Sequence, residues 1–444
     1  MSVFNSNDIR GVFNEDWDSG TAYRIGLHLG DIIDARKIGV GRDSRLSSDV
    51  LFDALTEGLT NSGVDVYDIG LCDTPALYFA VSNYNLDGGV MITASHNPPE
   101  YNGLKIVGKG SRPIGYRDGI AELEKLSNAK DPVATKVRIK GKKQKLDIEK
   151  DYLDFYRKYF ENLGNLRIVV DCSGGTAGVF GKEILSNISN AYSLINEVPD
   201  GNFTCHGPNP MLESNLEELK KEVLRWKGDV GLCFDGDADR VVFIDEKGNT
   251  VSPDLIIAIL AKYFLSGGKQ TILYDLRCSN GIAEYISECG GSAVMCPVGH
   301  TGIKKLLRAT GAVFGGELAG HYYFKDYFFS DSAWLTAILV LNVLRKTKES
   351  LSEISRKIQR YSYSGEINFA VDERIDIFSL LENRFSEGAF TKMDGLRVDY
   401  PDWWFVVRKS TNEPLVRLVV EARNSEALKA RVAELSRLIT GEKT

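Results

Sequence analysis

The sequence has few of the features that mark a zinc-binding, secreted or membrane-spanning protein. Its seven cysteines are odd in number and show no Cys-x-x-Cys spacing, which indicates neither a zinc site nor a disulfide framework. Residues 1–5 lack the basic and apolar regions of a signal peptide. The longest apolar run, near residues 333–344, is too short and too interrupted to span a bilayer. These absences favour a protein of the reducing cytoplasm.

Positive charge is also in short supply. The 444 residues include 54 Lys and Arg against 61 Asp and Glu, which gives a formal net charge of -7. This balance argues against nucleic acid or an anionic membrane as the main partner. Hydrophobic residues make up 43% and charged residues 26%, as in ordinary soluble globular proteins. The length favours three or four domains.

A strand–loop–helix pattern recurs three times along the chain. An apolar strand runs into a polar, mostly Gly/Ser/Arg-rich loop at residues 38–45, 167–175 and 271–281. Each copy continues into a helical stretch and a second strand that ends in a polar loop. The second strands are residues 89–92, 230–234 and 312–314. Alternating strands and helices predict three related α/β domains with mainly parallel sheets, and ligands bind at the carboxyl ends of such strands.

Two changes of pattern indicate domain boundaries. The lysine-rich residues 140–145 are interpreted as a solvated surface loop ahead of an amphipathic helix at 152–160. Beyond residue 362 the strand–loop–helix signature disappears, which suggests a smaller domain of α+β type. The predicted domains are residues 1–148, 149–252, 253–361 and 362–444.

A serine lies on a rigid loop after the strand at 89–92. The sequence of residues 93–98 is TASHNP, and a second proline, Pro99, follows. Small neighbours and prolines display Ser95 on a fixed loop, as a nucleophile or phosphate carrier requires. Taken alone, Ser95 fits an ordinary helix-capping turn about equally well.

Three carboxylates alternate with small residues at Asp235, Asp237 and Asp239. Alternate side chains of an extended loop point the same way, so these oxygens can converge on one cation. An EF-hand is excluded because Arg240 occupies the position that needs glycine, and residues 241–244 form a predicted strand. The spacing favours Mg²⁺ shared with a phosphate oxygen over a metal-free acidic turn.

Three further loops carry weaker signals. In residues 316–321, Glu317 can accept hydrogen bonds from paired hydroxyls and His321 can donate or accept, although a glutamate in such a glycine-rich turn is more often structural. His300 is at least as consistent with a satisfied loop histidine. Residues 408–414 group cationic, hydroxyl and amide side chains that could hold a phosphate, or could form a polar hairpin turn.

Together, four motifs resemble the α-D-phosphohexomutase family, in the family's order and along nearly the whole chain. They are TASHNPPEYNGLK at 93–105, DGDADR at 235–240, GELAGH at 316–321 and RKSTNEP at 408–414. The opening NSNDIRG at 5–11 looks like the phosphomannomutase/phosphoglucomutase branch. The phosphoglucosamine branch typically opens with FGTDGIRG and has glutamine where Leu318 stands.

The resemblance implies three related mixed/parallel-sheet α/β domains plus a smaller α+β C-terminal domain around a central cleft. It implies reversible transfer of phosphate between C1 and C6 of a hexose phosphate, through a phosphoserine and a hexose 1,6-bisphosphate that also serves as activator. One Mg²⁺ per chain is implied, with its ligands at Ser95, Asp235, Asp237 and Asp239. The implied catalytic residues are Ser95, His96, Lys105, Arg10 and Arg240. The implied substrate-binding residues are Arg277, His300, Glu317, Ala319, His321, Arg408, Ser410, Thr411 and Asn412.

This chain departs from the family pattern at several positions. Asn7 replaces an aromatic residue, Arg277 a lysine and Ala319 a serine, and residues 410–412 read Ser-Thr-Asn instead of Ser-Asn-Thr or Ser-Gly-Thr. These changes bear on substrate preference and leave the reaction type alone. The alternatives are a phosphoglucosamine mutase, a Mg²⁺-dependent sugar phosphatase and a sugar-phosphate-binding protein. The expected partners are small hexose phosphates, and the expected assembly is a monomer or small homo-oligomer.

Overall fold

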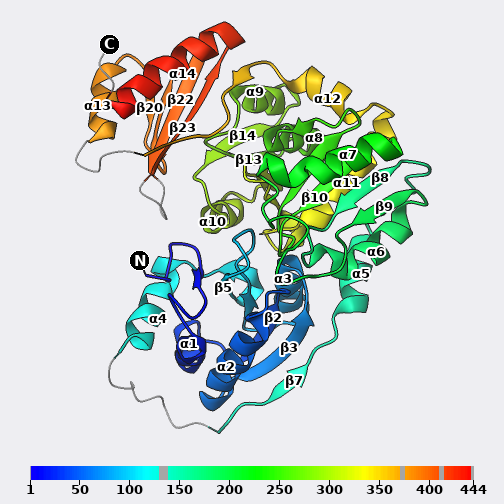
Figure 1. Ribbon diagram of the computed structural model, residues 1–444, viewed down its shortest axis with the longest axis vertical. Helices are drawn as coiled ribbons and strands as arrows, with labels where there is room; N and C mark the ends of the chain where they lie inside the picture. Colours follow the sequence, from blue (N-terminus) through cyan, green and yellow to red (C-terminus); the bar gives the residue numbers. More distant parts are fainter. Residues whose placement is uncertain (1, 130–138, 371–375, 410–414, 442–444) are drawn as a thin grey trace.

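The computed structural model describes residues 2–129, 139–370, 376–409 and 415–441. The chain forms four successive sheets, which run from the blue N-terminal domain to the red C-terminal domain in Figure 1. The first three sheets mix parallel and antiparallel pairs, and the fourth is antiparallel. The predicted fold class is therefore confirmed. No helix in the described ranges is long and apolar enough to cross a membrane.

The first sheet has the strand order β1-β5-β4-β2-β3-β7, with β6 beside β5. Its strands are β1 Ile9–Val12, β2 Lys37–Arg42, β3 Asp65–Leu71, β4 Gly88–Ile92, β5 Tyr101–Gly108, β6 Arg112–Pro113 and β7 Lys143–Lys145. Its helices are α1 Ser19–Ile32, α2 Ser48–Asn61, α3 Thr74–Asn83 and α4 Ile120–Ser127. The predicted loop at 140–145 is wrong in part, because β7 pairs with β3 as an edge strand. An edge strand is held by backbone hydrogen bonds and can expose its side chains to solvent. Its lysines therefore show no alternating hydrophobic pattern from which a strand could be predicted.

The second and third sheets repeat this plan with strand orders β12-β11-β10-β8-β9 and β14-β13-β15-β16-β17. The second contains β8 Ile168–Asp171, β9 Tyr192–Ile195, β10 Val230–Phe234, β11 Val241–Asp245 and β12 Thr250–Val251, with α5 Glu149–Arg157, α6 Ala177–Ile188 and α7 Glu217–Trp226. The third contains β13 Thr271–Asp275, β14 Ser292–Cys296, β15 Phe314–Gly316, β16 Tyr322–Phe324 and β17 Ser330–Asp331. Its helices are α8 Pro253–Leu265, α9 Asn280–Glu288, α10 His300–Thr310, α11 Ala333–Thr347 and α12 Leu351–Ile358.

Two predicted elements are displaced by a few residues. The helix expected at 152–160 is α5, which begins at Glu149. Acidic residues in a first turn favour a helix start, and this signal precedes the apolar stripe. The strand expected at 312–314 is β15, which continues through two glycines that give no hydrophobic signal. A Cβ on Gly316 would lie 2.5 Å from Ile257, so the close approach of α8 requires glycine there.

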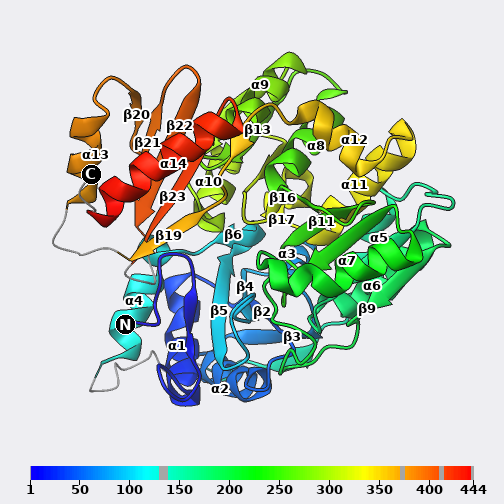
Figure 2. The ribbon, with the colours of Figure 1, turned by 45° about the horizontal axis from the view of Figure 1, so that its top comes forward.

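The fourth sheet has the order β18-β23-β22-β21-β20, with β19 also paired to β23. Its strands are β18 Ser362–Tyr363, β19 Ile367–Ala370, β20 Ala389–Thr391, β21 Leu396–Asp399, β22 Trp403–Lys409 and β23 Leu415–Ala422. Its helices are α13 Ile377–Arg384 and α14 Ser425–Thr440. Figure 2 shows α14 lying across this sheet, where Leu435 and Ile439 are buried.

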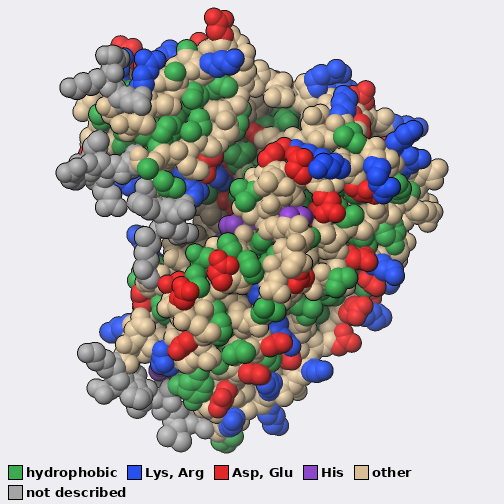
Figure 3. Space-filling model, in the orientation of Figure 1, with side chains coloured by type: hydrophobic (Ala, Val, Ile, Leu, Met, Phe, Trp, Pro, Cys, Tyr) green, Lys and Arg blue, Asp and Glu red, His purple; other side chains and the backbone are tan. Residues whose placement is uncertain are grey.

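The apolar cores divide the molecule unequally. One core joins the second and third domains to α3 of the first, and it includes Phe79, Tyr152, Phe234 and Trp334. The rest of the first domain and most of the fourth have separate cores. In the space-filling view a hollow lies between the C-terminal domain and the N-terminal domain, and a histidine side chain is visible at its edge (Figure 3). The shared core holds the first three domains together.

Candidate active site

Ser95 lies on the loop that follows β4, and its hydroxyl reaches the second domain. Its φ of 51° is in the left-handed region that few residues other than glycine adopt. The side chain is fully buried, and Oγ donates a hydrogen bond to Asp235 Oδ2 at 2.7 Å. Ser95 and Asp235 are 140 residues apart in sequence. The structure thus brings the predicted phosphate carrier against the predicted metal loop.

Arg45, which the sequence reasoning missed, holds this loop in place. Its fully buried guanidinium donates to the carbonyls of Ser95 (2.8 Å) and Asn97 (2.7 Å). It also donates to the carbonyls of Pro98 (2.6 Å) and Tyr101 (3.0 Å) and pairs with an aspartate of its own loop. Such a cage can offset the strain of a left-handed serine. The only sequence signal was an arginine in the first repeated loop, after β2.

The three aspartates occupy the turn between β10 and β11, and all are buried with their oxygens within 4.8 Å of one another. Asp235 Oδ1 accepts the backbone N–H groups of Asp239 (3.1 Å) and Arg240 (3.2 Å). Lys105 lies between the other two, with Nζ 2.6 Å from Asp237 Oδ2 and bonded also to Asp239. Burial lowers the pKa of Lys105, but Asp237 and Asp239 outweigh burial and raise it above its ordinary value.

The free oxygens of this cluster fit a divalent cation. Within the described ranges, Asp237 Oδ1 and Asp239 Oδ1 are buried and have no hydrogen-bond partner. Burial, followed by the charges of Asp239 and Asp237, raises the pKa of Asp235 well above its usual range. A buried carboxylate oxygen without a partner is costly, and a hard cation such as Mg²⁺ removes that cost.

Two other predicted catalytic side chains flank Ser95. The Arg10 guanidinium donates to Asn97 Oδ1 at 2.8 Å and to the carbonyl of Ala94 at 3.3 Å. His96 Nδ1 lies 3.3 Å from Ser95 Oγ. Burial, and then the positive charge of Arg240, lowers the pKa of His96 well below its ordinary value. The imidazole is therefore uncharged at neutral pH.

Arg240 faces the metal loop and joins it to the third domain. Its Nε lies 3.7 Å from Asp235 Oδ2. An isolated antiparallel bridge pairs Arg240 with His321, and the Val241 N–H donates to the Gly320 carbonyl at 3.1 Å. The loop predicted to read sugar hydroxyls is therefore attached directly to the loop predicted to bind metal.

Glu317 and His321 are both held by partners. The Gly299 N–H donates to Glu317 Oε1 at 2.6 Å, and the Tyr323 hydroxyl donates to Oε2. His321 Nδ1 lies 3.0 Å from Asp331 Oδ2, at the end of β17. Sequence reasoning missed Asp331 and Tyr323, because neither belongs to one of the four motifs.

A buried charge network continues behind His321. The fully buried Lys304 places Nζ 2.6 Å from Asp331 Oδ1. His300 lies one helical turn earlier on α10, and neither of its ring nitrogens has a hydrogen-bond partner within the described ranges. Burial, and then Lys304, lowers the pKa of His300 well below its ordinary value. A neutral, unpartnered imidazole beside the cleft can donate to or accept from a ligand.

The departures from the family pattern have visible consequences. Ala319 is half-buried and offers no hydrogen-bonding group. The Arg277 guanidinium donates two hydrogen bonds to the Asp275 carboxylate, at 2.6 and 3.2 Å. Its third nitrogen lies 3.5 Å from Glu366 Oε2 of the fourth domain. Arg408 lies near the end of β22 and pairs with Asp394 at 2.6 Å. The predicted phosphate contacts Ser410, Thr411 and Asn412 lie outside the described residues.

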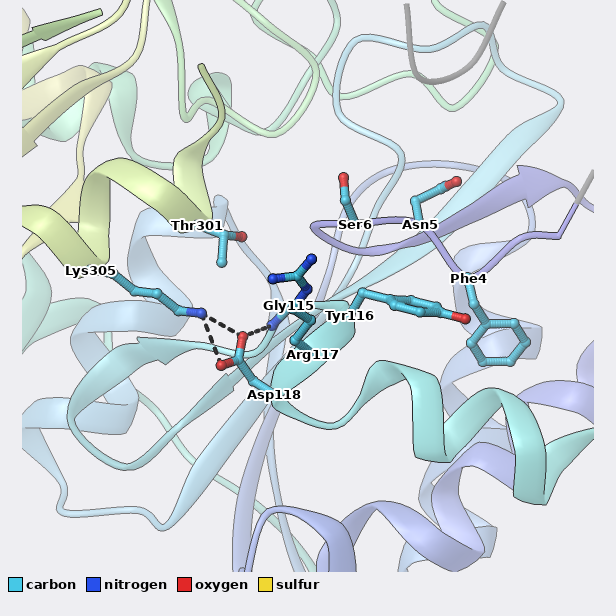
Figure 4. Close-up of a pocket in the computed structure, with 9 residues that line it drawn as sticks. All are labelled: Phe4, Asn5, Ser6, Gly115, Tyr116, Arg117, Asp118, Thr301 and Lys305. Atoms are coloured by element: carbon cyan, nitrogen blue, oxygen red, sulfur yellow. Dashed lines mark hydrogen bonds and ion pairs between the residues drawn. The ribbon is translucent and has the colours of Figure 1, made fainter. Parts of the chain in front are cut away.

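One pocket lies beside this cluster and does not include Ser95 or the three aspartates. It has a volume of about 480 Å³ and is formed where the N-terminal segment meets α10 (Figure 4). Lys305 pairs with Asp118 at 2.7 Å across the first and third domains. Thr301, next to His300, also lines the pocket. Its basic residues, Arg117 and Lys305, are exposed, and Lys305 is neutralised by Asp118.

Comparison with known proteins identifies the family. All four domains of the phosphoglucomutase/phosphomannomutase family match. Alpha/beta/alpha domain I matches residues 1–133, domain II 150–248, domain III 252–361 and the C-terminal domain 366–438. The chain belongs to this family and is a phosphohexomutase, as the sequence motifs predicted.

Individual relatives match along the full length. A phosphomannomutase of Escherichia coli K12 is 34% identical over 453 residues, which cover 99% of each chain. A phosphomannomutase of Methanocaldococcus jannaschii is also 34% identical, over 99% of this chain and 98% of its own. A crystal structure of a phosphoglucomutase/phosphomannomutase family protein from Burkholderia thailandensis superposes with a TM-score of 0.89 at 29% identity. It covers 99% of this chain and 97% of its own.

Proposed function

We propose that this phosphohexomutase interconverts the 1- and 6-phosphates of mannose and of glucose. One observation carries the proposal: the Ser95 hydroxyl, from the first domain, is bonded to a three-aspartate cluster of the second, with Lys105 between the carboxylates. This arrangement suits a serine that carries a phosphoryl group beside a Mg²⁺. The names of the phosphomannomutase relatives support the same reaction.

The chemistry is an exchange of phosphoryl groups. A substrate hydroxyl oxygen bonds to phosphorus as the bond between phosphorus and Ser95 Oγ breaks, which gives a hexose 1,6-bisphosphate. After the bisphosphate reorients in the cleft, Ser95 Oγ bonds to the phosphorus of its other phosphoryl group as the bond from that phosphorus to the sugar oxygen breaks. The sugar oxygen takes back the proton, which leaves the isomeric hexose phosphate and the phosphorylated serine. Ser95, Asp235, Asp237 and Asp239 would hold Mg²⁺, which supplies charge neutralisation at the transferring group. Arg10 and Arg240 would supply fixed positive charge, and Lys105 and His96 are the two candidates for moving the hydroxyl proton or contacting the phosphate.

The remaining predicted residues hold the sugar and its far phosphate. Glu317, fixed by Gly299 and Tyr323, would accept hydrogen bonds from sugar hydroxyls, with His300 and His321 beside it. Arg408 and residues 410–412 would contact the non-reacting phosphate, and Arg277 would line the substrate site with its guanidinium paired to Asp275. A site that must accept its intermediate in two orientations cannot hold the 2-position tightly in both. Because Ala319 adds no hydroxyl, discrimination between mannose and glucose is expected to stay within about 1–3 kcal/mol.

The proposal extends to organisation and setting. Domain boundaries near 148/149, 252/253 and 361/362 are supported by β7 ending at Lys145, α5 beginning at Glu149 and α8 beginning at Pro253. A hexose 1,6-bisphosphate serves as activator. The protein acts in the cytoplasm, as a monomer or small homo-oligomer, on small phosphosugars.

A coupled assay with mannose, glucose and glucosamine 1-phosphates, plus a hexose 1,6-bisphosphate, tests the substrate range. Similar specificity constants for mannose and glucose are expected, with glucosamine poorer because Leu318 offers nothing to an amino group. A clear preference for glucosamine would overturn the proposal, and steady release of inorganic phosphate would indicate a phosphatase. Chelation is expected to abolish activity without unfolding the protein, because the ligands lie on preformed strands and loops. Full activity after exhaustive chelation would contradict the metal assignment.

A further inference from the structure

Thr74 contacts the metal loop from another domain. It is the first residue of α3 in the first domain, and it is fully buried. Its hydroxyl donates to Asp237 Oδ2, and its backbone N–H donates to the Asp237 carbonyl at 2.9 Å. One residue therefore restrains both the side chain and the backbone of a predicted Mg²⁺ ligand. None of the four sequence motifs contains Thr74.

The two carboxylate oxygens of Asp237 differ in their hydrogen bonding. Oδ2 is used twice, by the Thr74 hydroxyl and by Lys105 Nζ at 2.6 Å. Oδ1 is buried and, within the described ranges, has no hydrogen-bond partner. A carboxylate that rotated away from Thr74 would leave the buried hydroxyl donor unsatisfied, which costs free energy. The hydroxyl thus fixes the plane of the carboxylate, with one oxygen bonded and the other free.

The start of α3 is itself held rigidly. Asp73 caps the helix through the Ala76 N–H (2.7 Å) and accepts the Tyr152 hydroxyl at 2.8 Å. The Tyr327 hydroxyl, from the third domain, donates to the Pro75 carbonyl at 2.8 Å. Groups of the second and third domains therefore fix the residues on both sides of Thr74. Its hydroxyl is presented to Asp237 before any ligand arrives.

We infer that Thr74 is a positioning residue for the metal site: its hydroxyl orients Asp237 so that Oδ1 faces Mg²⁺. The inference rests on the metal assignment in the proposed function and adds a residue that holds one of the metal ligands. Hydrogen-bond partners behind metal ligands typically contribute 10–100-fold to metal affinity, because they set the orientation of the ligand. Thr74 makes its contribution across a domain boundary, so assembly of the first and second domains itself completes the site.

Calorimetric titration of Mg²⁺ into chelator-treated enzyme tests the inference. Thr74→Val, which keeps the shape and removes the hydroxyl, is expected to weaken Mg²⁺ binding about 10–100-fold. Thr74→Ser should restore affinity to within about threefold, since it returns the donor. Activity of Thr74→Val should recover at saturating Mg²⁺. Thr60→Val is the matched control, because that buried hydroxyl donates to the Thr56 carbonyl (2.9 Å) and the Glu57 carbonyl (3.1 Å), within α2.

The outcomes separate this inference from the proposed function. Wild-type Mg²⁺ affinity in Thr74→Val, with binding lost in Asp237→Asn, overturns the role of Thr74 alone. Unchanged binding in Asp237→Asn overturns the metal assignment and the inference together. If Thr74→Val does not fold, Thr74→Ala against Thr74→Ser gives the same comparison. Equal weakening in Thr60→Val and Thr74→Val would mean a general loss of packing and would also overturn the inference.

Discussion

Charged side chains are buried at two domain junctions, and their hydrogen bonding differs. Where the first domain meets the second, Asp237 and Asp239 each keep an oxygen without a hydrogen-bond partner in the described chain, and Asp239 Oδ1 lies 3.6 Å from His321 Nδ1. Where the third meets the fourth, all three nitrogens of the fully buried Arg397 donate, to Asp399, the Leu276 carbonyl and Asn280. Arg397 also stacks 3.7 Å from the Trp404 ring.

This difference in hydrogen bonding distinguishes a candidate ligand-binding site from a structural contact between domains. Both junctions contain buried charge, so burial of charge alone does not identify chemistry. Oxygens left without partners, on strands and loops that are otherwise held rigidly, indicate a missing ligand. The first junction is therefore the one at which we propose the reaction, and the second attaches the fourth domain to the third. Glu421 at the second junction is a partial exception, because its Oε2 has no hydrogen-bond partner within the described residues.

The largest effect is expected at Ser95. Replacing Ser95 by alanine removes the phosphate carrier, and mutase activity should fall at least about 1,000-fold. The fold should be kept, since one hydrogen bond to Asp235 is lost. The coupled assay measures activity, and intact mass should show that a phosphorylated fraction of the wild type is missing in the variant. Near-wild-type activity in Ser95→Ala would show that the first junction does not react as proposed.

Arg45→Lys tests whether the rate of the reaction depends on the fixed position of the Ser95 loop. A lysine cannot serve four carbonyls, so the left-handed Ser95 should lose its fixed position and kcat should fall about 10–100-fold. The free energy of unfolding should also drop, because carbonyls are left buried without donors. Denaturant unfolding and kcat should be measured on the same preparation. An unchanged kcat despite lower stability would reduce Arg45 to a purely structural role.

Arg408→Ala addresses the fourth domain. If this domain only holds the far phosphate, KM should rise about tenfold, roughly the contribution of one charge-assisted contact, while kcat changes less. The Asp394 partner is partly exposed, so stability should hardly change. Steady-state kinetics with glucose 1-phosphate give the separation. A fall in kcat with constant KM would place Arg408 among the reacting groups and weaken the contrast between the junctions.

Glu421 gives the smallest predicted effect, through pH. Burial raises its pKa to about 7, against hydrogen bonds from Trp404 and the Asn280 backbone that favour the ionised form. A raised carboxyl pKa stabilises the fold below the unfolded value near 4.5, and this stability is lost as pH rises through about 7. The melting temperature should therefore fall from pH 5.5 to pH 8, and Glu421→Gln should reduce the fall by about 2–4 °C. An identical pH dependence in both proteins would contradict this assignment.

Sequence reasoning proposes the reacting groups but not the residues that hold them. It proposes Ser95 and the three aspartates because each lies in a short motif, where spacing along the chain expresses the chemistry. Arg45 and Thr74 were missed because they act on residues 50 and 163 positions away, and Asp331 was missed because it lies outside the four motifs. Residues 140–145 were misjudged for a related reason: β7 exists only through pairing with β3, and its exposed lysines carry no apolar pattern.

By itself, then, the sequence determined the family, the order of four domains and the local loops that carry the serine and the carboxylates. Periodicity and loop composition are local properties, and they are readable without knowing what packs against them. Only the tertiary structure decided which oxygens remain free and which arginines are already occupied. Thr74 is bonded to Asp237, which lies 163 residues away in sequence. Arg277 is ion-paired with Asp275 and Glu366. Hydrogen-bond satisfaction depends on every neighbour within about 3 Å in space, and packing alone brings those neighbours together.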